Sequence, residues 1–458
     1  AQGYLIGMSL WFYAYANLQY LWLLLFSCLI GWLLSCLSEK IFSEKGKKVL
    51  TGVGCVFHLG LLGYFKYSNF FLENLNTVFH TDFPMLQILL PVGISFYTFQ
   101  QLAYLIDRCR GDAPRDSFFD YLTFMVYFPQ LLQGPILLRS EFMGQLKEPE
   151  RRRFHAERFS EGIQFFVFGL AKKVLLADTL AKAVNYGYSN VSMLDSISAL
   201  LLAVGYLTEL YFDFSGYCDM AVGLGKMIGL EVAENFDAPF HSASVKEFWR
   251  RWHMTLGRFF TRYVYIPLGG NRRGKMRTLC NVMIVMLLSG LWHGAAWTFV
   301  LWGFLHGVGM IWDNLEHPHL PKKWMRQAAT FAYVCMTFVF FRAESIAQGV
   351  DVLKSIVSLK WNGFVFQMAS ALDMTECYMI TKALSMKLPG LLSWFWLGIF
   401  VVLIAICFRV LSGEKVSGVV ALQRQKGYGR LYPVLLAVLF TWSMISMTGV
   451  SEYLYFSF

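Results

Sequence analysis

His293 is the residue of this sequence best suited to chemistry. It lies in LLSGLWHGAAWTFVLWGF, inside the stretch 278–312, which contains no charged residue. An imidazole titrates near neutral pH and can therefore take a proton from a hydroxyl as a general base. Because a polar side chain is costly to bury in lipid, such a residue is a functional candidate by default. The other interpretation is a structural histidine that hydrogen-bonds a neighbouring helix.

The length of this apolar stretch predicts where His293 lies. As one helix, residues 278–312 would extend ~52 Å, against a hydrocarbon core of ~30 Å, so they must fold back. A turn near Gly290–Gly294 would leave 278–289 as a helix of only ~18 Å and place His293 near the middle of the bilayer. His306 would lie ~220° from His293 around one continuous helix. We therefore expect no metal site shared by the two and interpret His306 as structural.

A second histidine, His253, lies in EFWRRWHMTLGRFF. If this segment is one helix, His253 shares an apolar face with several aromatic residues. The opposite face carries Arg250, Arg251 and Arg258. The pattern predicts a basic amphipathic helix in the cytoplasmic interface of a membrane. It is either an interfacial anchor and nothing more, or its cations hold an anionic donor while His253 points inward.

Three carboxylates lie in a further apolar run. Glu209, Asp213 and Asp219 occur in ELYFDFSGYCDM, and the first two share a helix face at i, i+4. An ion-coupled transporter would use such carboxylates, and structural hydrogen bonds to neighbouring helices are the other interpretation. The nine cysteines are scattered without a C-x-x-C pair, so we expect neither a disulfide framework nor a zinc site. The sequence has no motif of a metalloprotease, an α/β-hydrolase or a P-loop protein.

Transmembrane helices are the elements that must position these side chains. Of the 458 residues, 56% are hydrophobic and 15% charged, whereas a soluble domain has about 25% charged residues. A crossing helix needs roughly 20 apolar residues, and we expect about eleven crossings if 278–312 is a hairpin. Residues 117–145 are broken by Pro129 and Gly134-Pro135 and are predicted not to span. The candidate spans are 3–16, 19–37, 49–66, 84–106, 161–177, 196–231, 278–312, 327–341, 390–410 and 432–449.

The net charge of +10 comes from cation clusters between the apolar segments. This is the positive-inside pattern of membrane loops, and it predicts that 39–48, 146–158 and 414–430 face the cytoplasm. A nucleic-acid-binding protein would gather its cations on one folded face, so we expect no nucleic acid as a partner. Because the sequence begins at Ala1 rather than at Met, it supports no conclusion about a signal peptide.

Several stretches together resemble the membrane-bound O-acyltransferase family. The resemblance is to the bacterial branch that O-acetylates alginate and other exopolysaccharides, which is related to the D-alanyl transfer protein of teichoic acid modification. The stretch IPLGGNR favours the acetylating branch, and Cys218 stands where this branch is expected to have Ser. The matching stretches, in family order, are GISFYTFQQLAYLID, FPQLLQGPI, YFDFSGYCDMAVGLGKMIG, FWRRWHMTLGRFF, YIPLGGNR, LSGLWHGAAWTFVLWGFLHG, FFRAES and SEYLYFSF.

The resemblance implies a fold and a set of site residues. The fold is an all-α, polytopic ring of transmembrane helices with re-entrant and interfacial helices, in one domain over 1–458 whose catalytic core is about 88–315. His293 matches the catalytic histidine of the family, and His253 matches the second functional histidine of this branch. The residues expected to bind the donor or substrate are Arg250, Arg251, Arg258, Trp292, Asp213, Ser215, Tyr217 and Gln133.

The resemblance also implies a reaction. An acetyl group from a cytoplasmic thioester, acetyl-CoA or another acyl thioester, would cross the cell (inner) membrane and reach an extracytoplasmic polysaccharide such as alginate. The donor is a substrate, and no bound cofactor or metal is expected. An exported or membrane-anchored acetyltransferase with a Ser-His-Asp site is the expected partner, and membrane lipids surround the multi-pass chain. The alternative is a transporter of a lipid-linked or small anionic intermediate without acyl chemistry.

Overall fold

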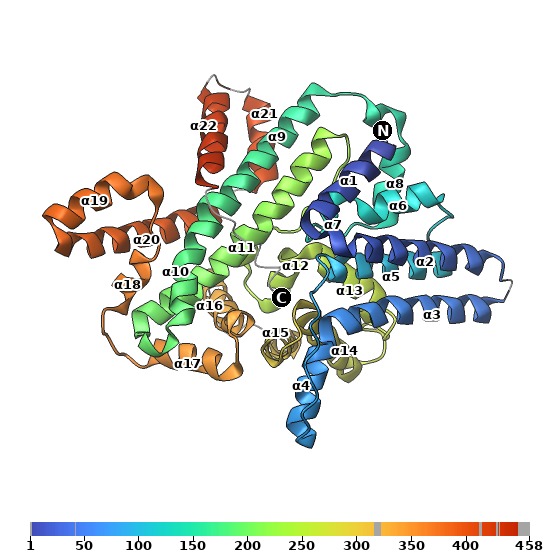
Figure 1. Cartoon of the computed structure of the whole chain (residues 1–458), viewed down its shortest axis with the longest axis horizontal. Helices are drawn as coiled ribbons and strands as arrows, with labels where there is room; N and C mark the ends of the chain where they lie inside the picture. The colour runs from blue at the N-terminus through green and yellow to red at the C-terminus, as the bar shows by residue number, and fades with distance from the viewer. Residues whose placement is uncertain are drawn as a thin grey trace.

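The computed structural model describes residues 2–41, 43–315, 322–411, 415–426, 429 and 431–447, and within these ranges it contains helices and no strand (Figure 1). The all-α prediction is confirmed. The α-helices are α1 (Gln2–Asn17), α2 (Leu21–Glu39), α3 (Glu44–Leu62), α4 (Ser68–Phe79), α5 (Ile94–Arg110), α6 (Phe118–Val126), α7 (Phe128–Leu131), α8 (Arg139–Lys147), α9 (Ala156–Ala171), α10 (Asp178–Ser189), α11 (Ser196–Met227), α12 (Val245–Arg251), α13 (Met254–Phe260), α14 (Lys275–His293), α15 (Trp297–Leu315), α16 (Lys323–Arg342), α17 (Ile346–Val357), α18 (Phe364–Ser370), α19 (Tyr378–Lys387), α20 (Pro389–Leu411), α21 (Val416–Lys426) and α22 (Leu431–Ser446).

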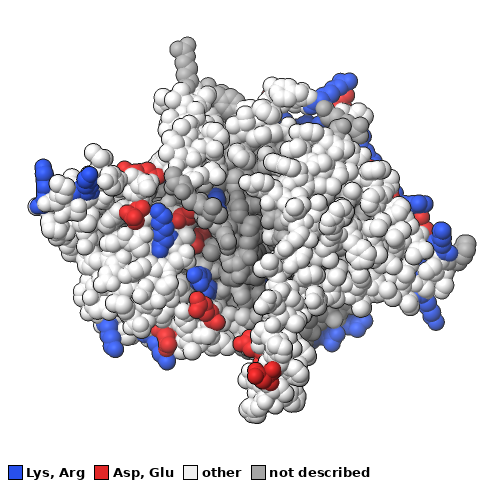
Figure 2. Space-filling view, in the orientation of Figure 1, with Lys and Arg blue, Asp and Glu red and all other residues white. Residues whose placement is uncertain are grey.

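Five helical segments of the described residues are long and apolar enough to cross a bilayer. They are Leu18–Glu39, Glu44–Phe79, Ser196–Met227, Lys275–His293 and Pro389–Val410. Much of the surface in Figure 2 is correspondingly uncharged, and on its right half the charged side chains lie mainly at the rim. These helices support the prediction of a multi-pass membrane protein.

The apolar stretch 278–312 folds back as predicted, with α14 and α15 antiparallel on either side of residues 294–296. Their close approach needs glycine at position 290, where a Cβ atom would lie 2.3 Å from the backbone oxygen of Phe299. However, α14 begins at Lys275 and has 19 residues, so it is ~28 Å long. The mid-bilayer depth of His293 was predicted from a short helix over 278–289. That short helix is wrong.

The region before α9 tests two further sequence predictions. Residues 117–145 form the short helices α6, α7 and α8 around a buried non-helical segment, as expected for a stretch that does not span. The predicted span 84–106 is wrong at its start, because α5 begins only at Ile94. The cause is local: Pro91 lacks a backbone N–H, and Gly93 has a left-handed φ of 76° just before the helix.

Helix α11 is the centre of the largest apolar core cluster and packs along α9 (Figure 1). At Gly169 of α9 a Cβ atom would lie 2.5 Å from the backbone oxygen of Gly216, so only glycine permits this approach. A π-helical turn after α9, η4 (Lys172–Ala177), directs two lysines at the α11 carboxylates. Lys172 Nζ lies 2.6 Å from Asp219 Oδ2, and Lys173 Nζ lies 2.6 Å from Asp213 Oδ1. These ion pairs favour the structural interpretation of both aspartates.

Candidate active site

His293 is the last residue of α14, and its helix end is held by side chains from another helix. Lys66 Nζ donates to the backbone oxygens of Trp292 at 2.7 Å and of His293 at 2.9 Å. The hydroxyl of Tyr67 donates to the backbone oxygen of Leu291 at 2.5 Å. The last carbonyls of a helix have no intrahelical donor, and leaving them unpaired in an apolar interior is costly. These contacts therefore set the position of His293.

Lys66 and Tyr67 reach this helix end because the helix that carries them contains a π-helical turn. A π-helical turn, η2 (Gly63–Tyr67), lies between α3 and α4 and keeps the segment helical from Glu44 to Phe79. Such turns widen the helix locally and are frequent at functional sites. A lysine at the C-terminal end of α14 also has the charge that the helix dipole favours.

His253 lies between two short helices rather than within one. Helix α12 ends at Arg251, His253 has a left-handed φ of 45°, and α13 begins at Met254. The continuous amphipathic helix predicted across this segment is therefore wrong. The break is stabilised by a partner distant in sequence, because the backbone N–H of Met254 donates to the backbone oxygen of Asn235 at 2.9 Å. A histidine in the left-handed region is uncommon and needs such support.

The side chain of Asn235 determines which nitrogen of His253 carries the proton. Asn235 Oδ1 accepts from the backbone N–H of Thr255 at 3.1 Å and from its hydroxyl at 2.9 Å. The same oxygen lies 3.2 Å from His253 Nδ1. A backbone N–H can only donate, so the atom facing Thr255 is the oxygen, and His253 Nδ1 must donate to it as well. The Nε2 atom of His253 then holds the lone pair of a neutral imidazole.

The two histidines lie together in an aromatic enclosure. The ring centroids of His253 and His293 are 6.4 Å apart, and Trp292 lies 6.0 Å from His253. Trp302 and Phe341 pack on His293 at 5.2 and 5.1 Å. Only 4% of His293 is exposed, and His253 is fully buried. A water-poor site of this kind strengthens electrostatic interactions with a reacting group.

His306 has the environment of a structural histidine. The indole N–H of Trp249 donates to His306 Nδ1 at 3.3 Å, which leaves the proton on Nε2. Nε2 lies 2.9 Å from the hydroxyl of Thr337, and that hydroxyl donates to the backbone oxygen of Val334 at 2.8 Å. Both nitrogens are thus engaged in fixing α15 to α12 and α16, as expected from the sequence.

The three arginines predicted to form one cationic face do not do so, because the helix is broken at Trp252 and His253. Arg250 is exposed. Arg251 pairs with Glu247 at 3.0 Å, and Arg258 pairs with Glu141 of α8 at 2.5 Å. Arg258 therefore connects α13 to α8, and Arg251 is paired within α12.

The remaining predicted donor-binding or substrate-binding residues are buried at separate points. Asp213 forms its ion pair with Lys173, and Tyr217 is buried on the same helix, α11. Ser215 lines a large cavity. Gln133 is fully buried between α7 and α8, and its amide forms no hydrogen bond with any residue that the structure describes. Of this set, Trp292 packs against both His253 and His293.

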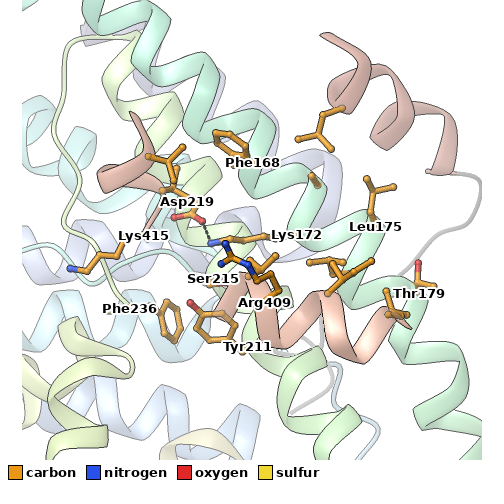
Figure 3. Close-up of a pocket in the computed structure, with 18 of the residues that line it drawn as sticks. Phe168, Lys172, Leu175, Thr179, Tyr211, Ser215, Asp219, Phe236, Arg409 and Lys415 are labelled. Carbon is orange, nitrogen blue, oxygen red and sulfur yellow. Dashed lines mark hydrogen bonds and ion pairs between the residues drawn. The ribbon is translucent and has the colours of Figure 1, made fainter. Parts of the chain in front are cut away.

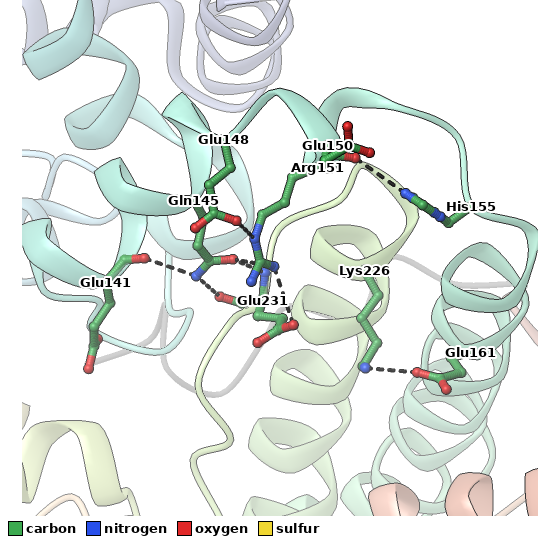
Figure 4. A network of polar contacts seen from close by, with 9 residues as sticks. All are labelled: Glu141, Gln145, Glu148, Glu150, Arg151, His155, Glu161, Lys226 and Glu231. Atoms are coloured by element: carbon green, nitrogen blue, oxygen red, sulfur yellow. Dashed lines mark hydrogen bonds and ion pairs between the residues drawn. The ribbon is translucent and has the colours of Figure 1, made fainter.

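The segment that carries Asn235 is anchored by a polar network (Figure 4). Beyond the end of α11, the backbone N–H of Glu231 donates to Gln145 Oε1 at 2.7 Å, and the Glu231 carboxylate lies 3.2 Å from Arg151. On α11 itself, Lys226 pairs with Glu161 of α9 at 3.0 Å. The network therefore anchors the chain just before Asn235.

A cavity of about 1330 Å³ lies on the Asn235 side of the site, between α9–α11 and α20–α22 (Figure 3). Its wall is mostly apolar, and the ion pair of Lys172 with Asp219 lies in it near Ser215 and Arg409. Typical small-molecule pockets have about 300–1,000 Å³. A large ligand therefore has space to bind beside the region of His253.

With this geometry in place, the comparison with known proteins identifies the family. A family model described as MBOAT, membrane-bound O-acyltransferase family, matches residues 111–348, just over half of the chain. The chain belongs to the membrane-bound O-acyltransferase family. It is therefore a multi-pass membrane acyltransferase, and the matched range contains both His253 and His293.

Several relatives of this acyltransferase are named as O-acetylating proteins. A peptidoglycan O-acetyltransferase of Helicobacter pylori is 36% identical over 388 residues, which are 78% of this chain and 73% of the relative. A probable alginate O-acetylase of Azotobacter vinelandii is 39% identical over 354 residues, 75% of this chain and 70% of the relative. A probable alginate O-acetylase of Pseudomonas putida is 41% identical over 309 residues, which are 65% of this chain and 62% of that relative.

Asn235 and Lys66 are the residues of this acyltransferase site that the sequence analysis missed. The sequence pattern could have indicated Lys66, because it is a single lysine between apolar residues at the end of the candidate span 49–66. No pattern indicates Asn235, because it lies in a polar connection where an asparagine is ordinary. Its importance follows only from contacts with residues 18 and 20 positions away.

We expect Asn235→Leu to lower the rate of acyl transfer at least tenfold, whereas Asn235→Asp retains most of it. Leucine cannot accept from His253 Nδ1, so the ring loses its fixed tautomer, and three buried donors lose their acceptor at about 1–3 kcal/mol each. Aspartate keeps an oxygen at the same place. Transfer rates and thermal stability of purified variants measure both effects. A full rate in Asn235→Leu would contradict this role of the amide.

Proposed function

We propose that this acyltransferase moves acetyl groups from acetyl-CoA in the cytoplasm across the inner membrane for the O-acetylation of a polysaccharide. The observation that carries the proposal is the pair of enclosed imidazoles, His253 and His293, whose centroids lie 6.4 Å apart. The family match supports acyl transfer, and the relatives support acetylation of a cell-surface glycan such as alginate or peptidoglycan. The proposal includes about eleven crossings of the membrane.

The proposed step assigns one role to each histidine. His293 takes the proton of the acceptor hydroxyl, whose oxygen attacks the thioester carbonyl. The new C–O bond forms, the C–S bond breaks, and the proton passes to the departing thiolate. His253, whose Nδ1 donates to Asn235, directs Nε2 toward proton transfer or toward orienting the thioester. General-base assistance contributes about 10²–10⁴-fold, so the enclosure must supply the rest by positioning.

The large cavity beside Asn235 is the proposed location of the donor. It has the volume for an extended thioester arm, and Lys172, Arg409 and Lys415 line it. These cations replace the arginine face predicted from the sequence, because Arg251 and Arg258 are engaged in ion pairs. Lys415 also pairs with Asp237 at 2.8 Å, so the wall is a mixture of both charges.

A direct test compares donors with purified protein in detergent. We expect acetyl release from acetyl-CoA to an added hydroxyl acceptor, detected as free CoA thiol and as acetyl ester. An acetylated carrier protein with a phosphopantetheine thioester is the matched alternative donor. Activity with the carrier protein alone would overturn acetyl-CoA as the donor and keep the acyl chemistry. Activity with neither thioester would overturn the proposed function.

A further inference from the structure

A second, much smaller cavity touches His293 directly. It has a volume of about 50 Å³ and lies between the end of α14, the start of α5 and Leu132. Lys66, Ser95 and His293 supply its polar wall, while Leu90, Pro91, Val92, Phe96 and Leu132 supply much of its apolar wall. An apolar corner and hydrogen-bond donors thus lie beside a candidate general base. This composition is what a site needs to hold a small acyl group.

The polar wall of this cavity presents donors to a carbonyl oxygen. Lys66 Nζ makes short contacts with two backbone oxygens and a longer one, 3.4 Å, with Ser95 Oγ. The longest contact is the weakest, so it is the one that an entering carbonyl oxygen would replace. Since the Ser95 hydroxyl accepts from a lysine, its own proton can be donated to a second oxygen. Both groups are held on helical segments, which favours precise positioning.

The size of the cavity restricts what can enter. A water-sized group needs about 10–15 Å³ by the same measure of volume. A cavity of about 50 Å³ therefore holds an acetyl group and excludes a long acyl chain. The wall is closely packed at Gly93, where a Cβ atom would lie 2.4 Å from the backbone oxygen of Leu131.

We propose that this cavity is the acyl pocket of the enzyme, and that it limits the transferred group to a short chain. This rests on the proposed function. The methyl group of the acetyl lies against Leu132 and Leu90, and its carbonyl oxygen accepts from Lys66 or Ser95. As the acceptor oxygen bonds to the carbonyl carbon and the sulfur departs, these donors stabilise the oxyanion, and His293 carries the proton from the acceptor to the thiolate.

The proposal predicts a change of acyl specificity on enlarging the pocket. We expect Leu132→Ala to raise the ratio of kcat/KM for butyryl-CoA over acetyl-CoA about tenfold or more, since a methylene in an apolar pocket changes selectivity by about 10–200-fold. Leu90→Ala, at a half-buried position, should shift the ratio in the same direction with less risk to folding. Leu122→Ala is the matched control, because Leu122 is as buried as Leu132 and is not among the residues that line this cavity. Its ratio should stay at the wild-type value.

Lys66→Met tests the polar wall. We expect kcat to fall at least about 10²-fold for every donor, with KM little changed, because the variant loses an oxyanion-stabilising group and also the donor that holds the end of α14. Unaltered specificity in both leucine variants, with wild-type transfer from acetyl-CoA intact, would overturn the acyl pocket and leave the proposed function standing. No transfer by the wild type from either acetyl-CoA or the acetylated carrier protein would overturn both.

Discussion

Replacing His293 by alanine should lower acetyl transfer at least a hundredfold while the protein remains folded. The side chain is enclosed by aromatic rings and lies at the end of α14, whose carbonyls are held by Lys66 and Tyr67 through backbone contacts. Those contacts do not involve the imidazole, so its removal leaves the helix end in place. The rate loss corresponds to the general-base contribution of about 10²–10⁴-fold. Single-turnover acetyl transfer and thermal unfolding in detergent measure rate and stability on the same sample.

A matched control is another buried histidine outside the site. His58 on α3 is 1% exposed, and its Nδ1 lies 3.3 Å from the hydroxyl of Ser27. His58→Ala should cost stability, because it opens a cavity and removes the partner of a buried hydroxyl, and should keep most of the rate per folded molecule. More than a tenth of the wild-type rate in His293→Ala would show that this residue is not the base. Equal rate losses in both variants would show that the effect is one of folding.

The second large effect concerns the partner. In vesicles with acetyl-CoA inside and polysaccharide outside, this chain alone should give negligible acetylation of the glycan. Adding an extracytoplasmic acetyltransferase with a Ser-His-Asp site should restore it, because we propose that this protein passes acetyl groups to such an enzyme. A variant of that enzyme with alanine in place of its serine nucleophile should leave acetylation at background. Ester formation on the glycan, measured with labelled acetyl-CoA, is the readout.

The shape of the site favours a relay. His253 and His293 lie in an aromatic enclosure with little exposed surface, which suits one small hydroxyl at a time better than an extended glycan. The connection 343–388, between the candidate spans 327–341 and 390–410, contains the helices α17, α18 and α19 and has no G-x-S-x-G sequence. Efficient glycan acetylation by this chain without a partner would show that it is the complete enzyme and would refute the relay.

The helical membrane class, the fold-back of 278–312 and the interruption of 117–145 could all be predicted from the sequence. These features depend on local chemistry: an apolar run longer than the bilayer must turn, and proline and glycine interrupt helices wherever they occur. His293 could be singled out for the same reason, since one polar residue in a charge-free run is visible without a fold. The resemblance of the motifs to the acyltransferase family then implied a reaction for His293.

The construction of the site depends on contacts between segments that are distant in the chain. The break at His253 depends on hydrogen bonds from Asn235, and a helix pattern read along EFWRRWHMTLGRFF cannot include a partner on another segment. The support of His293 comes from Lys66, which is 227 positions away in the chain. Arg258 is unpaired in the local sequence pattern, but the fold brings Glu141 of α8 beside it. Buried polar groups take whichever partner the packing brings near, and spacing along one segment does not encode that choice.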